Sequence, residues 1–327
     1  MSSPTRFSYG LIIATLVLAD WLHLAVPLLA VLFSLFILNK LHFTRYKWLT
    51  VLVFVIVLAG ILYTAGHFTK AAVVALPKIA ENSIPSILAW AQAHNIELPF
   101  TDYESLKTEA MDTVKEQAHY LGNFATFARG ASTTLIFLIV GIVVAVSLFL
   151  NSQLDLDRNS HRIKNNLYSI CCDEVAARFR TFYESFATVM GAQLLISAIN
   201  TVLTSIFIFG VRLPYAPVMV GLTFICGLVP LVGGLISNSI IAALAFTVSP
   251  KLALGALLFL VVIHKLEYFL NSKIVGNRIR NPVWLTLLAL IIGERLMGIA
   301  GMVLAPVVLN YIRLEASQIE VKTPAQK

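Results

Sequence analysis

The chain has 327 residues, of which 58% are hydrophobic and 13% are charged, and its formal net charge is +7. Soluble domains usually contain roughly 25% charged and 45 to 50% apolar residues, so this composition excludes an ordinary soluble protein. The apolar residues form blocks of about 18 or more, long enough to cross roughly 30 Å of hydrocarbon as helices. No alternating ten-residue pattern indicates a membrane barrel. The sequence therefore predicts an all-α, polytopic membrane helix bundle.

The basic residues lie in short loops between the apolar blocks, which is typical of topology signals rather than of a nucleic-acid-binding face. We therefore expect the lipid bilayer, and no nucleic acid, as a partner. The three cysteines are Cys171, Cys172 and Cys226, and none has a CxxC spacing. They predict neither a zinc site nor a disulfide framework, and no metal or cofactor is expected.

The first predicted region, 1–69, contains three membrane helices. Residues 9–38 are apolar but are interrupted by Asp20, His23 and Pro27, which favours two helices that meet near Trp21. The basic segment 39–48 follows, and the positive-inside rule places it in the cytoplasm. A third helix over about 48–69 then runs outward.

Residues 70–130 form the most polar stretch, with seven acids and five Lys or Arg, and are predicted to be extracytoplasmic. Thr101 and Glu104 match a capping box ahead of an amphipathic helix. This helix would either lie on the membrane surface or pack against a neighbour. Residues 131–150 then return inward as a membrane helix.

Residues 151–184 have mixed charge and are predicted to be cytoplasmic and helical. The next apolar block, 185–211, runs outward and carries a polar stripe on one helix face, at offsets of 0, 4, 7 and 11: Gln193, Ser197, Asn200 and Thr204. Such a stripe either holds helices together or lines a solute path.

Residues 185–315 are predicted to form the transport core, followed by a tail at 316–327. Two of its apolar blocks are interrupted. In 218–248, Pro230 removes a backbone donor and the pair Gly233–Gly234 weakens the helix. In 283–312, the pair Glu294–Arg295 lies among helix-weakening residues, namely Gly293, Gly298, Gly301 and Pro306. Backbone freed by such breaks has to be satisfied by protein or water inside a bilayer.

Charge counting favours re-entrant hairpins over full crossings. The loop 273–280 has three Lys or Arg and no acid, and it would face outward if 218–248 crossed fully. If that block instead enters and leaves from the outside, the final block dips in from the cytoplasm, and two hairpins approach from opposite faces. Glu294 and Arg295 would then lie near a hairpin tip, where they neutralise each other or meet a polar solute. The alternative places this pair in a plain loop between two full crossings.

Three segments in the C-terminal part resemble motifs of one known family. LVPLVGGLIS at 228–237 is similar to an I-P-x-x-G segment, LEYFLNSKIVG at 266–276 to an L-E segment ending in I-x-G, and MGIAGMVLAP at 297–306 to a G-x-x-G-x-x-x-A-x-P close. In this order they resemble the autoinducer-2 exporter family, whose members are multi-pass bacterial membrane proteins. The resemblance implies transport, the bacterial inner membrane and a homo-oligomer.

The function expected from these features is gradient-driven export of a small polar metabolite or signalling molecule. The alternative is a sodium (or lithium)/proton antiporter, which needs a carboxylate deep in the bundle. The sequence lacks the motifs of an ATP-driven pump or a metalloprotease, GxxxxGK[ST] and HExxH, and has no Ser/His/Asp set, so no enzyme is predicted.

His264 and Glu267 lie one helical turn apart, and either bind a cation or proton or form a snorkelling cluster with Lys265 at the interface. The predicted solute-binding residues are those of the polar stripe, the two breaks and this pair: Gln193, Asn200, Pro230, Gly233, Gly234, Asn238, His264, Glu267, Asn271, Glu294, Arg295, Gly298 and Gly301.

Overall fold

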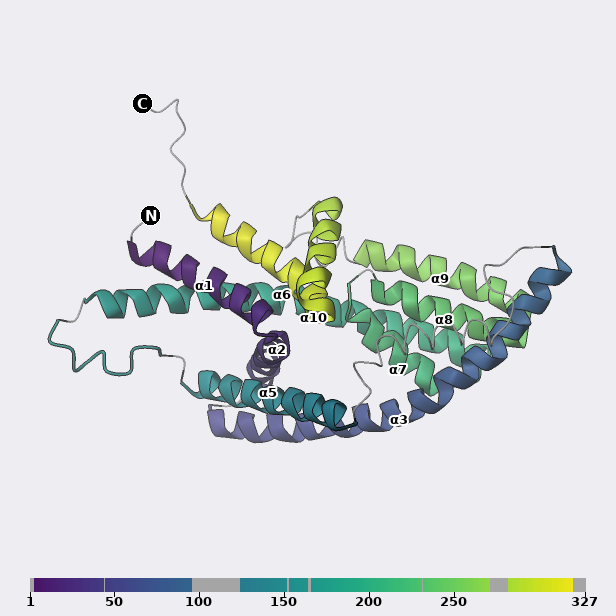
Figure 1. Cartoon of the computed structure of the whole chain (residues 1–327), viewed down its shortest axis with the longest axis horizontal. Coiled ribbons are helices and arrows are strands. Elements are labelled where there is room, and N and C mark those ends of the chain that lie inside the picture. The colour runs from purple at the N-terminus through teal and green to yellow at the C-terminus, as the bar shows by residue number, and fades with distance from the viewer. Residues whose placement is uncertain are drawn as a thin grey trace, which may run out of the picture. The chain divides into compact units, whose positions relative to one another are not determined.

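A computed structural model describes residues 3–43, 45–95, 124–151, 153–163, 166–230, 232–270 and 282–319 (Figure 1). The helices in these ranges are α1 (Ser3–Trp21), α2 (Ala25–Leu41), α3 (Lys47–Ala93), α5 (Phe124–Leu150), α6 (Leu167–Gly210), α7 (Ala216–Gly227), α8 (Val232–Val248), α9 (Pro250–Leu270) and α10 (Val283–Ser317). The predicted capping box at Thr101 and the basic loop 273–280 lie outside the described residues.

The predicted all-α membrane bundle is confirmed. The described residues contain no strand, and four of their helical segments are long and apolar enough to cross a membrane, namely Lys47–Ala93, Thr133–Leu150, Leu167–Gly210 and Trp284–Ser317. Helices α1 and α2 are joined by a very short turn at residues 22–24, as the polar interruption at Asp20 and His23 predicts. His23 has a φ of 53° in this turn.

Two helices continue across positions at which a change in polarity predicts the end of a segment. Helix α3 continues from Lys47 to Ala93, beyond the expected end of the membrane segment at 69. Helix α6 continues from Leu167 to Gly210, across the expected boundary between 184 and 185. A change in polarity marks a change of surroundings, whereas a helix ends only where its backbone hydrogen bonds are broken. The assignment of these stretches to one side of the membrane stays a prediction.

The chain divides into two compact units, and each is described by itself. Unit 1 comprises residues 1–57, 134–191 and 275–327. Its apolar core is built from helices α1, α2, α6 and α10, and the largest side chains in it include Phe182, Phe186 and Tyr311. The Phe182 and Tyr311 rings meet edge to face, with their centroids 5.5 Å apart. This core therefore ties the start of α6 to the end of α10.

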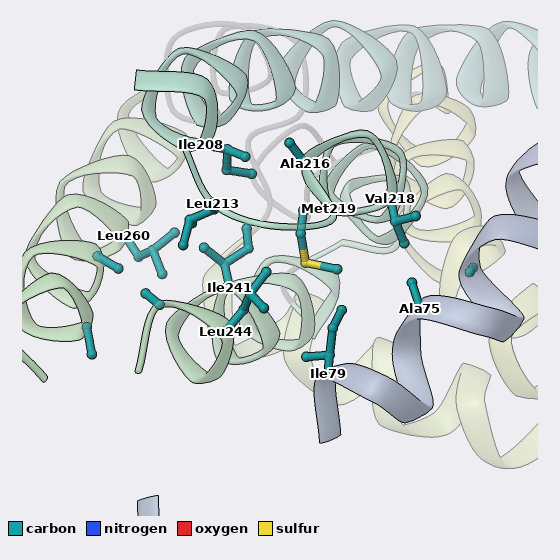
Figure 2. Close-up of a cluster of buried hydrophobic side chains, with 14 residues drawn as sticks. Ala75, Ile79, Ile208, Leu213, Ala216, Val218, Met219, Ile241, Leu244 and Leu260 are labelled. Atoms are coloured by element: carbon teal, nitrogen blue, oxygen red, sulfur yellow. The ribbon is translucent and has the colours of Figure 1, made fainter. Parts of the chain in front are cut away.

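Unit 2 comprises residues 58–133 and 192–274. Parts of α3 and α6 pack with α7, α8 and α9 around one apolar cluster, which Figure 2 shows in close-up. Ile208, Met219 and Ile241 are completely buried in it. Helix α8 packs against both α7 and α9, and only Ser249 separates α8 from α9. The Ser249 hydroxyl accepts a hydrogen bond from the Leu252 N–H at 3.1 Å and so caps the start of α9.

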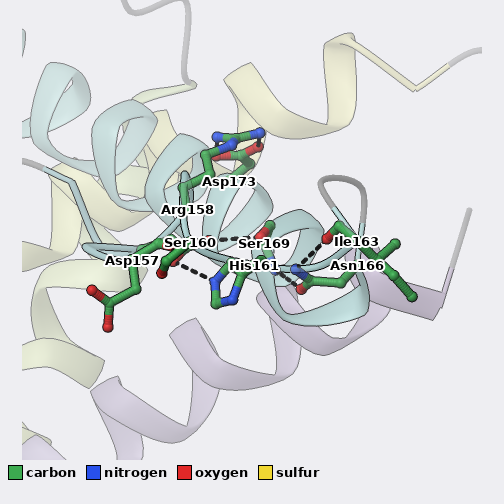
Figure 3. A network of polar contacts seen from close by, with 9 residues as sticks. Asp157, Arg158, Ser160, His161, Ile163, Asn166, Ser169 and Asp173 are labelled. Carbon is green, nitrogen blue, oxygen red and sulfur yellow. Dashed lines mark hydrogen bonds and ion pairs between the residues drawn. The ribbon is translucent and has the colours of Figure 1, made fainter.

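Residues 153–163 and Asn166 precede α6, and several of them contact its first turns (Figure 3). Asn166 caps the helix, because its side-chain oxygen accepts the Ser169 N–H at 2.9 Å. The Ser169 hydroxyl in turn donates to Asp155 at 2.6 Å, and this hydrogen bond is the main cause that lowers the pKa of the Asp155 carboxyl. Arg158 forms a two-bond ion pair with Asp173 at 2.8 and 2.9 Å. These contacts attach Asp155, Arg158 and Asn166 to the first turns of α6.

A buried ion pair connects α6 to the end of α10 in unit 1. Arg178 contacts Glu315, whose side chain is only 4% exposed, and also Glu174 at 3.3 Å. The Tyr9 hydroxyl of α1 donates to the same Glu315 carboxylate at 2.7 Å, and the Arg178 guanidinium lies over the Tyr9 ring. Because the buried Glu315 carboxylate needs both the Arg178 cation and the Tyr9 hydroxyl, this cluster holds three helices in one arrangement.

The second predicted break is present in α10, which reverses direction although its length alone would allow it to cross a membrane. Met297 and Gly298 have non-helical backbone angles, with a φ of 60° and a ψ of −140° at Gly298. Gly293 and Gly301, on either side of the turn, approach so closely that a Cβ on either one would overlap the carbonyl group of the other. The chain 283–317 is therefore a helical hairpin with its turn at 297–298.

Replacing Gly298 by alanine is expected to destabilise the folded protein by about 1–3 kcal/mol, because an L residue is strained in this backbone conformation. Nothing else opposes the change, since a Cβ at Gly298 meets no atom within 4 Å. Gly255→Ala is the matched control: this glycine also has open space around it but lies inside α9. There alanine should stabilise by roughly 0.5–1 kcal/mol. Thermal unfolding in detergent would measure both, and equal shifts would contradict the turn at Gly298.

Candidate functional site

The first predicted break lies between α7 and α8. Helix α7 ends at Gly227 and α8 begins at Val232, and the turn between them contains Pro230. The two helices pack against each other, so the chain reverses at the turn. At about 1.5 Å per residue, the 12 residues of α7 are roughly 18 Å long, too short to cross a bilayer core of about 30 Å. Their geometry fits the predicted re-entrant hairpin, while its position in a membrane stays a prediction.

The two helices of this hairpin have a close backbone contact next to the turn. Gly233, in the first turn of α8, lies against the Cys226 carbonyl near the end of α7, and a Cβ on Gly233 would overlap that carbonyl group. The Gly233 N–H donates to the Val229 carbonyl at 3.2 Å. Only glycine permits two helix ends to approach this closely at position 233.

Two residues of the α6 polar stripe satisfy carbonyls that the break sets free. The last carbonyls of a helix have no partner within the helix. The Gln193 amide donates to the Gly227 carbonyl at 2.6 Å, and the Ser197 hydroxyl donates to the Phe224 carbonyl at 2.8 Å. Both polar side chains are buried, at 7% and 1% exposure. In this half of the stripe, the polar side chains hold α6 and α7 together.

The other half of the stripe is buried without such partners. Asn200 and Thr204 are 8% and 1% exposed, and the Asn200 Oδ1 and Thr204 Oγ1 atoms have no hydrogen-bond partner among the residues that the structure describes. Unpaired buried polar atoms are rare and costly, of the order of 1–3 kcal/mol each. Whether this end of the stripe binds a solute stays a prediction.

Glu267 of α9 is the buried carboxylate of the site. The residue is 9% exposed, and its carboxylate interacts with the His264 ring one turn earlier and with the Asn200 side chain of α6. A Cβ built on Gly234 would lie 3.2 Å from the Glu267 Oε2 atom, so the carboxylate lies against the first turn of α8. The N-terminal turn of a helix favours an anion, because its free N–H groups carry partial positive charge.

The structure thus brings several predicted residues together and leaves others apart. Asn200, Gly234, His264 and Glu267 form one cluster, which we call the Glu267 cluster. Lys265 is exposed, and whether it forms an interfacial cluster with His264 and Glu267 stays a prediction. Pro230 and Asn238 lie in the turn and in the second turn of α8, both partly exposed, and Asn271 lies outside the described residues.

Glu294, Arg295, Gly298 and Gly301 belong to the α10 hairpin of unit 1. The Glu294 and Arg295 side chains are 52% and 85% exposed and lie 3.8 Å apart, just before the turn. This agrees with the predicted place near a hairpin tip. Whether the pair meets a solute stays a prediction.

Sequence reasoning missed the Arg178–Glu315–Tyr9 cluster. The Glu174–Arg178 spacing of four residues was its one local signal, and it indicates only a common helical pair. The contact of Arg178 with Glu315 joins residues 137 positions apart, which no local pattern reveals.

Comparison with known proteins identifies the group to which this arrangement belongs. The chain is 25% identical over 268 residues to "Putative transport protein YdbI" of Bacillus subtilis (strain 168), covering 80% of this chain and 75% of that protein. The model of the AI-2E family transporter matches residues 9–313, and the match therefore includes the α7–α8 hairpin, the turn of the α10 hairpin and the Glu267 cluster. The chain belongs to the AI-2E transporter family and is a membrane transporter.

Proposed function

We propose that the protein is a secondary exporter of a small polar metabolite or signalling molecule, similar to autoinducer-2, in the bacterial inner membrane. The observation that carries this proposal is the broken α7–α8 hairpin, whose freed carbonyls are satisfied by Gln193 and Ser197. Broken helices that meet polar side chains are the usual construction of solute sites in secondary transporters. The family name and the absence of a GxxxxGK[ST] motif agree with transport driven by a gradient rather than by ATP.

The energy source in this proposal is an ion gradient, and its partners are the lipid bilayer, protons or sodium ions and other copies of the chain. Glu267 supports this choice, because intramembrane carboxylates commonly serve ion or proton relays. Glu294 and Arg295 are proposed to meet the solute at the second hairpin.

Export would be tested with everted membrane vesicles from cells that overproduce the protein. Accumulation of autoinducer-2 is expected under an imposed proton gradient, and a protonophore should abolish it. Glu267→Gln, which keeps the side-chain shape and removes the charge, should reduce accumulation at least about tenfold, since roughly 1.4 kcal/mol of lost coupling is sufficient for that factor. Accumulation that is equal in vesicles without the protein would reject autoinducer-2 as cargo.

The second candidate is a sodium (or lithium)/proton antiporter, and the buried Glu267 carboxylate favours it as well. Proteoliposomes with an internal pH dye distinguish the two functions. An antiporter would move protons when sodium is added outside, and Glu267→Gln would abolish that movement. The proposed exporter would move protons only when its cargo is present.

A further inference from the structure

The Glu267 cluster contains a charge and an unused acceptor side by side. The Glu267 carboxylate is buried between α6, α8 and α9, where an isolated ionised carboxylate is costly. The neighbouring Asn200 residue is 8% exposed, and its Oδ1 atom has no partner among the described residues. An amide oxygen can only accept a hydrogen bond, so a donor is missing at this position.

We propose that Glu267 is the proton-binding group of the transporter and that the Asn200 amide is its partner in both protonation states. When Glu267 takes up a proton from water, its new O–H donates to the Asn200 Oδ1 atom. When the proton leaves, the amide turns and its NH₂ group donates to the carboxylate instead. An amide carries a donor and an acceptor on one short side chain, whereas an ammonium group has no acceptor.

The surroundings of Glu267 also accommodate the ionised form of its carboxylate. The carboxylate lies beside Gly234 in the first turn of α8, the end of a helix at which a negative charge is favoured. His264 on α9 is the titratable group that interacts with Glu267 in the described part of the chain, and its Nδ1 atom is buried without a partner. On α6 and α8 the facing positions, Asn200 and Gly234, carry no charge. Uptake and release of one proton therefore change the charge of the cluster without a Lys or Arg counter-ion in the part of the chain that the structure describes.

This assignment also separates the two acidic candidates. The Glu294 side chain is 52% exposed and already lies near Arg295. A carboxylate with a neighbouring cation and access to water remains ionised without a special partner. Glu267 is buried and has no Lys or Arg beside it among the described residues, so the proton-binding role falls to it. The inference rests on the proposed function, since it names the coupling ion of the same transport site.

Infrared difference spectroscopy of the full-length protein in lipid vesicles, taken between alkaline and acidic pH, tests the proposal without any cargo. The wild type should show a carboxylic C=O band that Glu267→Gln removes and Glu294→Gln retains. Asn200→Leu should keep the band but shift it to higher frequency, because the carboxylic acid loses a hydrogen bond. Circular dichroism of each variant would check that the helices remain.

A band that survives in Glu267→Gln, or that is lost in Glu294→Gln, would overturn the proposal. A band that does not move in Asn200→Leu would overturn the role of Asn200. If the band behaves as expected while vesicles fail to accumulate autoinducer-2, the proposed cargo is wrong and the proton site stands. If accumulation is normal and no Glu267 band is found, the transporter uses another coupling group.

Discussion

Replacing Gly233 by alanine is expected to destabilise the folded protein by about 3 kcal/mol, the upper end of the usual cost of overpacking. The added methyl group would overlap the Cys226 carbonyl. This neighbour is backbone at the end of α7, so no side-chain rotation relieves the clash. We expect the α7–α8 hairpin to open and the Gly227 carbonyl to lose its hydrogen bond from Gln193.

The adjacent glycine is the matched control for this prediction. A Cβ on Gly234 would lie 3.2 Å from the Glu267 Oε2 atom, and a carboxylate can move by a few tenths of an ångström. Gly234→Ala should therefore cost less than about 1 kcal/mol, in the range of tolerated core changes, while it disturbs the Glu267 cluster. Thermal unfolding measured by size-exclusion fluorescence compares the two variants. If Gly233→Ala is as stable as the wild type, the close contact between the helix ends is wrong.

The second large effect is expected at the ion pair of unit 1. Arg178→Met should destabilise by about 3–5 kcal/mol, because it leaves Glu315, 4% exposed, as a buried charge without its cation. The double variant Arg178→Met/Glu315→Leu removes both charges and should recover most of this loss. The same unfolding assay measures the single variants and the double variant.

The control for the ion pair is Arg158→Met. Arg158 and Asp173 also form an ion pair, but their side chains are 50% and 56% exposed, so we expect no clear change in stability. Equal effects at Arg178 and Arg158 would contradict the burial of the first pair. A double variant that is less stable than Arg178→Met would show that Glu315 has enough other partners.

The breaks in the helices were predictable because they have local causes. Pro230 lacks a backbone donor, and Gly233 and Gly298 lie where two helix ends meet or a turn needs a positive φ. The meeting of α1 and α2 near Trp21 follows from polar residues in an apolar run. Each of these features depends on a few consecutive residues, so it can be recognised in the sequence without knowledge of the fold.

The partners across helices were not predictable in the same way. The stripe on α6 indicates a polar face, but only the fold shows that Gln193 and Ser197 pair with α7 while Asn200 lies near Glu267. These contacts join residues 27 to 67 positions apart in the chain. The length of α3 was missed because its polar second half stays helical through apolar contacts of Ala72, Ala75 and Ile79 in unit 2.

The account depends on the α7–α8 hairpin entering and leaving the membrane on one side. Cysteine labelling tests this most directly, in a variant whose Cys171, Cys172 and Cys226 are replaced by serine. Pro214→Cys precedes α7, and Lys251→Cys follows α8; both positions are exposed. An impermeant maleimide added outside intact cells should label both. Labelling of one position from outside and the other only from the cytoplasm would mean a full crossing and would contradict the hairpin.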